Sequence, residues 1–399
     1  MRQAPRAPLA QSKEPATAPI QARRALGIYP SVLFRRQPSG LASPLAASPR
    51  VRVLSEHTPQ EPAWRQVLAA YQRPSLPRSI LEIALSAGPL LAIWACAWVA
   101  SAFGLWWLAL LLAVPAAGFM VRLFIVQHDC SHRSFFRSAA ANDWTGRVIG
   151  VLTMTPYDCW RRSHAVHHAT AGDLDHRGLG DIATLTVDEY RALPFWRRLG
   201  YRLYRHPVVL FGLGPAYLFV VEQRLPVGLM REGIWPWVSA MTTNAMVAVL
   251  AVSVGWLAGW PALLLVHLPT MALAASIGVW LFFVQHQFER TYWARRGSWN
   301  PTEAALQGSS HYDLPAVLRW MTGNIGVHHV HHVGSRIPFY RLPAVLRDHP
   351  ELRDVNRLSL GASLRCAGLS LWDEASQRLI SFRQFRRLAV AKAPARDLA

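Results

Sequence analysis

Hydrophobic positions are concentrated in two long stretches of the chain that contain no charged residue. Residues Ile83–Val121 and Gly233–Phe288 lack Asp, Glu, Lys and Arg over 39 and 56 residues, respectively. An α-helix rises about 1.5 Å per residue, so each stretch is long enough to cross a hydrocarbon core of about 30 Å twice. The pattern therefore predicts two helical hairpins. Their four membrane helices are expected near Ile80–Ser101, Gly104–Val126, Trp235–Val254 and Pro261–Phe283.

The basic residues agree with hairpins that begin and end on the same side of a membrane. The chain carries 42 Lys and Arg against 23 Asp and Glu, for a formal net charge of +19. Twelve of the basic residues precede the first hairpin, fourteen lie between the hairpins and sixteen follow the second. Because positively charged flanks stay in the cytoplasm, all three regions are expected there, beneath a bacterial inner membrane. Uncharged runs of this length disfavour the alternative, a soluble protein with buried core helices.

Three further segments complete the predicted organisation. Residues 1–60 are rich in Ala, Pro, Ser and Arg, which predicts a mobile basic arm. Residues 61–345 are expected to form the membrane domain, and residues 346–399 a cytoplasmic helical tail. Pro207–Val221 is apolar but fifteen residues long, which favours an interfacial or re-entrant segment over a crossing. The four cysteines lack the paired spacing of a disulfide framework or a zinc site.

Nine of the histidines fall at helix-face spacings beside the hairpins. They are His128 and His132 in HDCSH, His164, His167 and His168 in HAVHH, His286 in QHQFE, and His328, His331 and His332 in HHVHH. Residues i, i+3 and i+4 share one face of a helix, so each cluster directs its imidazoles to one place. Imidazole is a good ligand for iron, copper, nickel or zinc. A structural zinc site closes with four ligands, so nine imidazoles from four segments predict two metal ions.

Other polar residues near the clusters are expected to have supporting roles. A ligand histidine needs an acceptor on its second ring nitrogen, and Asp129 is the favoured candidate, ahead of Asp158, Asp173 and Asp175. Cys130 is expected to pack between helices. His267 lies inside a predicted crossing, where a hydrogen bond between helices is favoured over catalysis. Surface or hydrogen-bonding roles are expected for His57, His176, His206, His311, His329 and His349.

The three boxes and the additional histidine resemble those of the membrane fatty acid desaturase family. That family carries boxes of the form HxxxH or HxxxxH, HxxHH and HxxHH, and the similarity covers about residues 80–345. The segment TGNIGVHHVHHVGSRIPFYRL resembles the omega-6, delta-12-like bacterial branch. In the acyl-CoA delta-9 branch an Asn precedes the additional histidine by four residues, where this chain has Phe282. The resemblance implies an all-α integral membrane protein whose cytoplasmic helical cap holds two iron ions on the nine histidines.

The resemblance also implies an activity: O₂ and two electrons are used to introduce a cis double bond into a fatty acyl chain. An unactivated methylene has no acidic proton, so acid–base catalysis cannot start the reaction and a redox metal is required. The electrons would come from a separate carrier, such as ferredoxin or a cytochrome b5-like protein. The sequence shows neither a fused haem-binding segment nor a ferredoxin-like run of cysteines.

Two alternatives stay open, whereas nucleic-acid binding is excluded because the positive charge flanks membrane segments. A lipid hydroxylase or ketolase needs the same boxes and differs only in the fate of the substrate radical; the residues around His286 and His328 favour desaturation. A membrane metal transporter would place its ligands along a path near the midplane of the bilayer. Only His267 lies there, which disfavours transport.

Overall fold

The computed structural model describes residues 64–391, so the predicted N-terminal arm and His57 lie outside the described residues. Four helical stretches are long and apolar enough to cross a membrane. They confirm the two predicted hairpins and match the predicted limits to within a few residues. They are α2 (Leu76–Ala102), α3 (Trp106–Ser131), α9 (Trp235–Leu257), and a continuous stretch of α10 (Trp260–Ala262), η5 (Leu263–His267) and α11 (Leu268–His286).

A glycine reverses the chain in each hairpin. Gly104 and Gly259 have φ angles of 72° and 85°, a left-handed conformation that glycine adopts without steric cost.

Helix α3 continues past the apolar stretch to Ser131, so the first histidine box extends the helix beyond its most hydrophobic part, as predicted. In α3, Ala109, Ala113 and Ala116 are fully buried, and small residues at such positions allow helices to approach closely.

A buried arginine, paired within the first hairpin, joins this hairpin to another part of the molecule. The side chains of Arg122 in α3 and Glu82 in α2 are only 1% exposed and form an ion pair. The Arg122 guanidinium also donates to the carbonyl of Trp320 and lies 4.0 Å from the centre of its ring. A buried charge is costly unless it is paired. These contacts therefore hold α13 (Ala316–Met321), which contains Trp320, against the hairpin.

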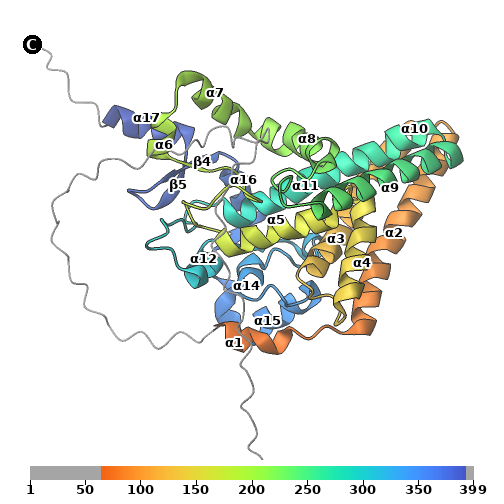
Figure 1. Cartoon of the computed structure of the whole chain (residues 1–399), viewed down its shortest axis with the longest axis horizontal. Coiled ribbons are helices and arrows are strands. Elements are labelled where there is room, and N and C mark those ends of the chain that lie inside the picture. Colours follow the sequence, from red (N-terminus) through yellow and green to blue (C-terminus); the bar gives the residue numbers. More distant parts are fainter. Residues whose placement is uncertain (1–63, 392–399) are drawn as a thin grey trace, which may run out of the picture.

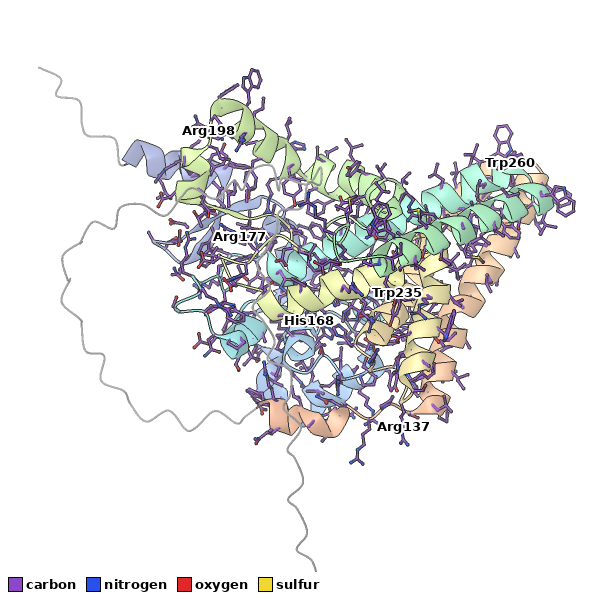
Figure 2. The ribbon with its side chains drawn as sticks, in the orientation of Figure 1. Arg137, His168, Arg177, Arg198, Trp235 and Trp260 are labelled. Atoms are coloured by element: carbon purple, nitrogen blue, oxygen red, sulfur yellow. The ribbon has the colours of Figure 1, made fainter. Side chains whose placement is uncertain are left out.

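The other elements form a cap at one end of the membrane helices (Figure 1). The labelled residues Arg137, Arg177 and Arg198 lie on this cap, and Trp260 lies at the opposite tip of the molecule (Figure 2). This is the one-sided arrangement that the basic residues predict. The cap helices not yet named are α1 (Trp64–Leu68), α4 (Ala139–Leu152), α5 (Tyr157–Thr170), α6 (Val187–Ala192), α7 (Phe195–Tyr204), α12 (Pro301–Gln307), α14 (His328–Val333), α15 (Leu342–Asp348), α16 (Leu360–Cys366) and α17 (Phe382–Ala391), with the short turns η2 (Ala69–Tyr71), η6 (Phe339–Arg341) and η7 (Pro350–Arg353).

The C-terminal region differs from the purely helical tail predicted for residues 346–399. Besides α16 and α17, its described part contains the strands β3 (Arg357–Ser359), β4 (Leu369–Asp373) and β5 (Arg378–Ser381). Strand β4 pairs with β5 and with β1 (Leu185–Thr186), and β3 pairs with β2 (His311–Asp313). The strands are two to five residues long, too short for alternation to stand out in the sequence. They tie the tail to the segments that follow α5 and precede α14.

The apolar segment between the hairpins is helical but short. It forms η3 (Val209–Leu213) and α8 (Gly214–Val220), which pack on α11 and are followed by the turn η4 (Glu222–Arg224). At about 1.5 Å per residue, a helix of this length falls well short of a hydrocarbon core of about 30 Å. The segment therefore does not cross, and its interfacial or re-entrant placement stays a prediction.

Candidate metal centre

The nine predicted ligands come from the ends of two membrane helices and from two cap helices. His128 lies in the last turn of α3, and His132 is the first residue after that helix ends. His286 is the last residue of α11. The remaining histidines lie on α5 and α14, where each HxxHH box forms part of one helical face. The four segments meet where the membrane bundle joins the cap, which brings all nine imidazoles together.

The imidazoles form two separate groups, and within each group the ligand nitrogens lie within 4.8 Å of one another. One group contains His128, His132, His164, His168 and His331; the other contains His167, His286, His328 and His332. Both HxxHH boxes are divided between the groups. In α5, His164 and His168 belong to the first group and His167 belongs to the second. In α14 the assignment is reversed: His328 and His332 belong to the second group and His331 to the first. Each of these two helices therefore bridges both groups.

The spacing of the nitrogens fits a metal ion in each group. Nε2 of His164 lies 3.0 Å from that of His132, and Nε2 of His286 lies 3.0 Å from that of His328. Two imidazole nitrogens bound at right angles, each about 2.1 Å from one ion, are about 3.0 Å apart. Nitrogens directed at one another at this distance, with no carboxylate between them, are the arrangement expected around a shared cation.

Four imidazoles on α5 and α14 are held in the neutral form that a metal ligand requires. Burial lowers the pKa of His164, His168, His331 and His332 well below the usual value, and the neighbouring imidazoles lower the pKa further. A neutral imidazole has a free lone pair on one ring nitrogen, whereas an imidazolium has none. These four imidazoles can therefore bind a cation without first releasing protons.

Asp129, the predicted supporting residue, lies beside the first group. Its Oδ1 is 3.3 Å from Nδ1 of His128, and its Oδ2 accepts a hydrogen bond of 2.6 Å from the backbone N–H of Phe339. Donation from Nδ1 leaves Nε2 of His128 as the free nitrogen. Within the described residues this buried Nε2 has no hydrogen-bond partner, as expected for an atom that binds a metal.

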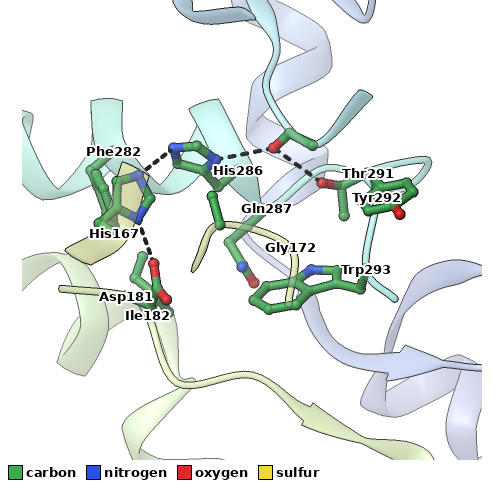
Figure 3. Close-up of a pocket in the computed structure, with 12 residues that line it drawn as sticks. His167, Gly172, Asp181, Ile182, Phe282, His286, Gln287, Thr291, Tyr292 and Trp293 are labelled. Atoms are coloured by element: carbon green, nitrogen blue, oxygen red, sulfur yellow. Dashed lines mark hydrogen bonds and ion pairs between the residues drawn. The ribbon is translucent and has the colours of Figure 1, made fainter. Parts of the chain in front are cut away.

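A second carboxylate, Asp181, was missed by the sequence analysis. Its Oδ1 lies 2.5 Å from Nδ1 of His167, and the two side chains point toward one another in Figure 3. The carbonyl of Gly308 lies 3.0 Å from Nδ1 of His286. Asp181 is fourteen residues beyond its histidine, in a loop, so no helical spacing indicates it. The loop can approach α5 because a Cβ on Gly180 would lie only 2.8 Å from the carbonyl of Ser163.

The other three candidate aspartates have different partners. Asp158 forms an ion pair with Arg147, and Asp173 and Asp175 form ion pairs with Arg296 and Arg295. The Asp158 pair joins α5 to α4, and the Asp173 and Asp175 pairs join the loop after α5 to the loop after α11. None of these ion pairs involves the nine imidazoles. Proximity in sequence was therefore a poor guide to which carboxylate supports a ligand.

Loss of the Asp181 carboxylate is expected to weaken the second group. Replacing Asp181 by alanine removes the acceptor that fixes the His167 ring, and loss of such a partner lowers metal affinity or activity about 10- to 100-fold. The measurement is metal content and turnover of the purified protein. Asp175→Ala, which alters a half-exposed carboxylate paired with Arg295, is the control and should behave as wild type. Equal metal content and turnover in both variants would contradict the role of Asp181.

Aromatic rings pack against three of the candidate ligands. Trp160 stacks on the ring of His164 with 4.5 Å between the ring centres. Phe282 lies 5.0 Å from the ring of His167 and 5.3 Å from that of His286. Phe282 occupies the position at which the acyl-CoA delta-9 branch has an Asn. It makes an apolar wall here and has no polar atom to hold a water molecule.

Several of the described histidines outside the pattern make hydrogen bonds, in agreement with the roles expected for them. His311 and His329 are buried but lie 2.6 and 2.8 Å from the carbonyls of Arg353 and Leu352, respectively. His267 accepts a hydrogen bond of 3.0 Å from the indole N–H of Trp98 in α2, so it joins two membrane helices. Cys130 is buried and belongs to neither metal-binding group.

A cavity of about 630 Å³ opens beside both groups. His128 and His164 of the first group and His328 of the second line it, together with apolar residues of α3, α8 and α11. It extends along α11 as far as Met271, which lies in the membrane-spanning stretch. No Lys or Arg is among its lining residues. The cavity therefore suits a long, uncharged, apolar ligand that reaches the imidazoles.

The fold and the site define a class: membrane proteins with two groups of histidines, each able to hold a metal ion, beside an apolar cavity. The sequence profile described as fatty acid desaturase matches residues 105–360. A fatty acid desaturase of Bacillus subtilis (strain 168) is 40% identical over 336 residues, which cover 84% of this chain and 94% of the relative. The chain belongs to the fatty acid desaturase family and is therefore an oxidoreductase.

Matches to two relatives of lower identity cover a smaller part of each relative. The chloroplastic omega-6 fatty acid desaturase of Arabidopsis thaliana is 26% identical over 252 residues, covering 55% of this chain and 48% of the relative. The sn-1 acyl-lipid omega-3 desaturase (ferredoxin) of Synechocystis sp. is 29% identical over 239 residues, covering 55% of this chain and 61% of the relative. The relatives thus include both omega-6 and omega-3 enzymes.

Proposed function

We propose that this protein introduces a cis double bond into the acyl chain of a membrane lipid, at a delta-12 or omega-6 type position. The observation that carries the proposal is that two histidine groups lie at the wall of one apolar cavity whose lining contains no Lys or Arg. Two iron ions held by five and four histidines would supply the oxidising power, with O₂ as co-substrate. The reaction balances as –CH₂–CH₂– plus O₂, two electrons and two protons, giving –CH=CH– and two water molecules.

The chain's own residues contribute binding, orientation and the exclusion of water. The apolar walls formed by α3, α8 and α11 hold the acyl chain and keep it dry, and this fixes one pair of carbons near the imidazoles. The neutral histidines supply the lone pairs for the metal ions. Asp129 and Asp181 hold the rings of His128 and His167 in the tautomer that leaves Nε2 free.

The electron donor and the location are part of the same proposal. A relative is described as ferredoxin-dependent, and an acidic carrier such as ferredoxin or a cytochrome b5-like protein suits a chain with a net charge of +19. The basic flanks favour an inner-membrane protein whose cap, and with it the metal centre, faces the cytoplasm. We assign the catalytic part to residues 61–345, a range that overlaps the family match over residues 105–360.

Lipid analysis of a suitable host tests the proposal. The protein is expressed in bacteria whose lipids contain saturated and monounsaturated but no diunsaturated chains, and the fatty acids are profiled by mass spectrometry. A new double bond at a single position is expected. A hydroxylated product would reassign the protein to the hydroxylase alternative. An unchanged profile, with iron bound and a ferredoxin and its reductase co-expressed, would refute the proposed function.

A further inference from the structure

One carboxyl group in the substrate cavity has no assigned role. Two acidic residues line the cavity, Asp181 and Glu222. Asp181 is engaged with His167, but the buried Oε2 of Glu222 has no hydrogen-bond partner within the described residues. A buried polar atom without a partner costs free energy. Glu222 is therefore a candidate for contact with a ligand that the cavity binds.

The turn that carries Glu222 is held firmly in place. Glu222 begins η4, directly after the apolar segment, and Arg224 ends it. Nη1 of Arg224 donates a 2.8 Å hydrogen bond to Oδ1 of Asn244, and Nδ2 of Asn244 donates one of 2.8 Å to the carbonyl of Arg224. The Arg224 guanidinium also donates to the carbonyl of Met154. Arg224 thus binds α9 and the end of α4, and it does not pair with Glu222.

The environment of Glu222 favours its neutral form. Burial raises the pKa of Glu222 to about 7, so a large fraction carries a proton at neutral pH. A protonated carboxyl is a hydrogen-bond donor, whereas a carboxylate can only accept. A donor in an apolar cavity matches a ligand with an uncharged acceptor, such as a carbonyl oxygen.

The charge of the cavity narrows the choice of ligand. No Lys or Arg lines the cavity, so the cavity offers no positive charge to a phosphate. An acyl thioester whose head group contains a nucleotide carries phosphates, and these phosphates would find no basic residue in the cavity. The ester linkage of a glycerolipid is uncharged and ends in a carbonyl, so it fits beside Glu222.

We propose that Glu222 binds the ester carbonyl of an acyl glycerolipid and so determines which pair of carbons lies at the metal centre. The inference rests on the proposed function, because it requires an acyl substrate in this cavity. Glu222 acts as a positioning residue: the ester is held at η4, and the methyl end extends along α11 toward Met271. When the ester end is fixed, each carbon of the flexible acyl chain lies at a defined distance from the ester, so the same pair of carbons is placed beside the imidazoles.

The test combines product position with rate. Purified variants receive vesicles of palmitoyl-oleoyl-phosphatidylglycerol with a ferredoxin and its reductase, and the double-bond position is determined by mass spectrometry. Glu222→Leu is expected to bind iron as wild type, to give a mixture of positional isomers, and to lose about tenfold in turnover at limiting lipid, the loss expected for one buried hydrogen bond. Glu222→Gln retains a donor and should keep the wild-type position. Glu232→Leu, at an exposed acidic residue outside the cavity, is the matched control.

A second variant decides the matter if Glu222→Leu fails to fold. Glu222→Asp keeps the acid but withdraws it by about 1.5 Å, the length of one carbon–carbon bond. It should therefore shift the product mixture while iron binding is retained. Wild-type position and rate in Glu222→Leu, or an unchanged position in Glu222→Asp, would overturn the inference and leave the desaturase function intact. Wild-type protein that produces no double bond would refute the function itself.

Discussion

Replacing His328 by alanine is expected to abolish desaturation while the protein still inserts into the membrane. Nε2 of His328 lies 3.0 Å from that of His286 and 3.1 Å from that of His332, and the side chain also lines the substrate cavity. Its loss leaves the second group with three imidazoles. Even a residue that only supports a ligand contributes about 10- to 100-fold, so removal of a ligand should lower turnover more than about 100-fold.

Metal content separates this explanation from a general loss of folding. The variant should retain metal in the first group and lose it from the second, so that elemental analysis finds about half of the wild-type iron. His329→Gln is a demanding control: His329 is the adjacent residue and is equally buried, but its Nε2 bonds to the carbonyl of Leu352. Glutamine can preserve that bond, and activity should persist. Full activity in His328→Ala would remove His328 from the ligand set.

Substitution of leucine for Gly278 should obstruct the membrane-embedded part of the cavity. Gly278 lies on α11 and lines the cavity, and a Cβ built there meets no heavy atom within 4 Å. The leucine side chain therefore enters open space without displacing the backbone. Because it occupies volume that the acyl chain needs, turnover of oleoyl chains should fall at least about tenfold and turnover of the shorter palmitoleoyl chains less, since one methylene in a pocket contributes about 10- to 200-fold in selectivity.

A glycine elsewhere in the membrane supplies the control. Gly88 in α2 is exposed, has equally open surroundings and does not line the cavity. Gly88→Leu should therefore leave both rates unchanged. The measurement is the ratio of the diunsaturated products made from oleoyl and from palmitoleoyl chains in the same host. An unaltered ratio in Gly278→Leu would show that the acyl chain does not run along this part of α11.

The sequence predicted the membrane architecture because its signals are local. Uncharged runs of 39 and 56 residues can satisfy their backbone groups inside a membrane only as helices, and the structure has the two hairpins at those places. The i, i+3 and i+4 spacings placed the imidazoles of each box on one face of a helix. Neither inference required knowledge of which segments lie next to each other.

The strands and the supporting carboxylate were harder to predict because their partners are distant in sequence. Leu371 in β4 pairs with Leu185 in β1, and neither short segment carries a pattern of its own. Asp181 was overlooked in favour of aspartates nearer to the boxes, since the approach of its loop depends on a close contact at Gly180. The lining of the cavity likewise combines α3, α5, α8 and α11, which no single stretch of sequence reveals.

By itself the sequence determined that four helices cross a membrane and that nine imidazoles lie at helix-face spacings beside them. Only the tertiary structure decided how these imidazoles divide into five and four, because α5 and α14 each contribute to both groups. It also decided that the cavity reaches both groups and contains Glu222. The physical reason is that hydrophobicity and helical periodicity act over a few turns of chain, whereas a shared metal site and a ligand cavity depend on packing between segments more than a hundred residues apart.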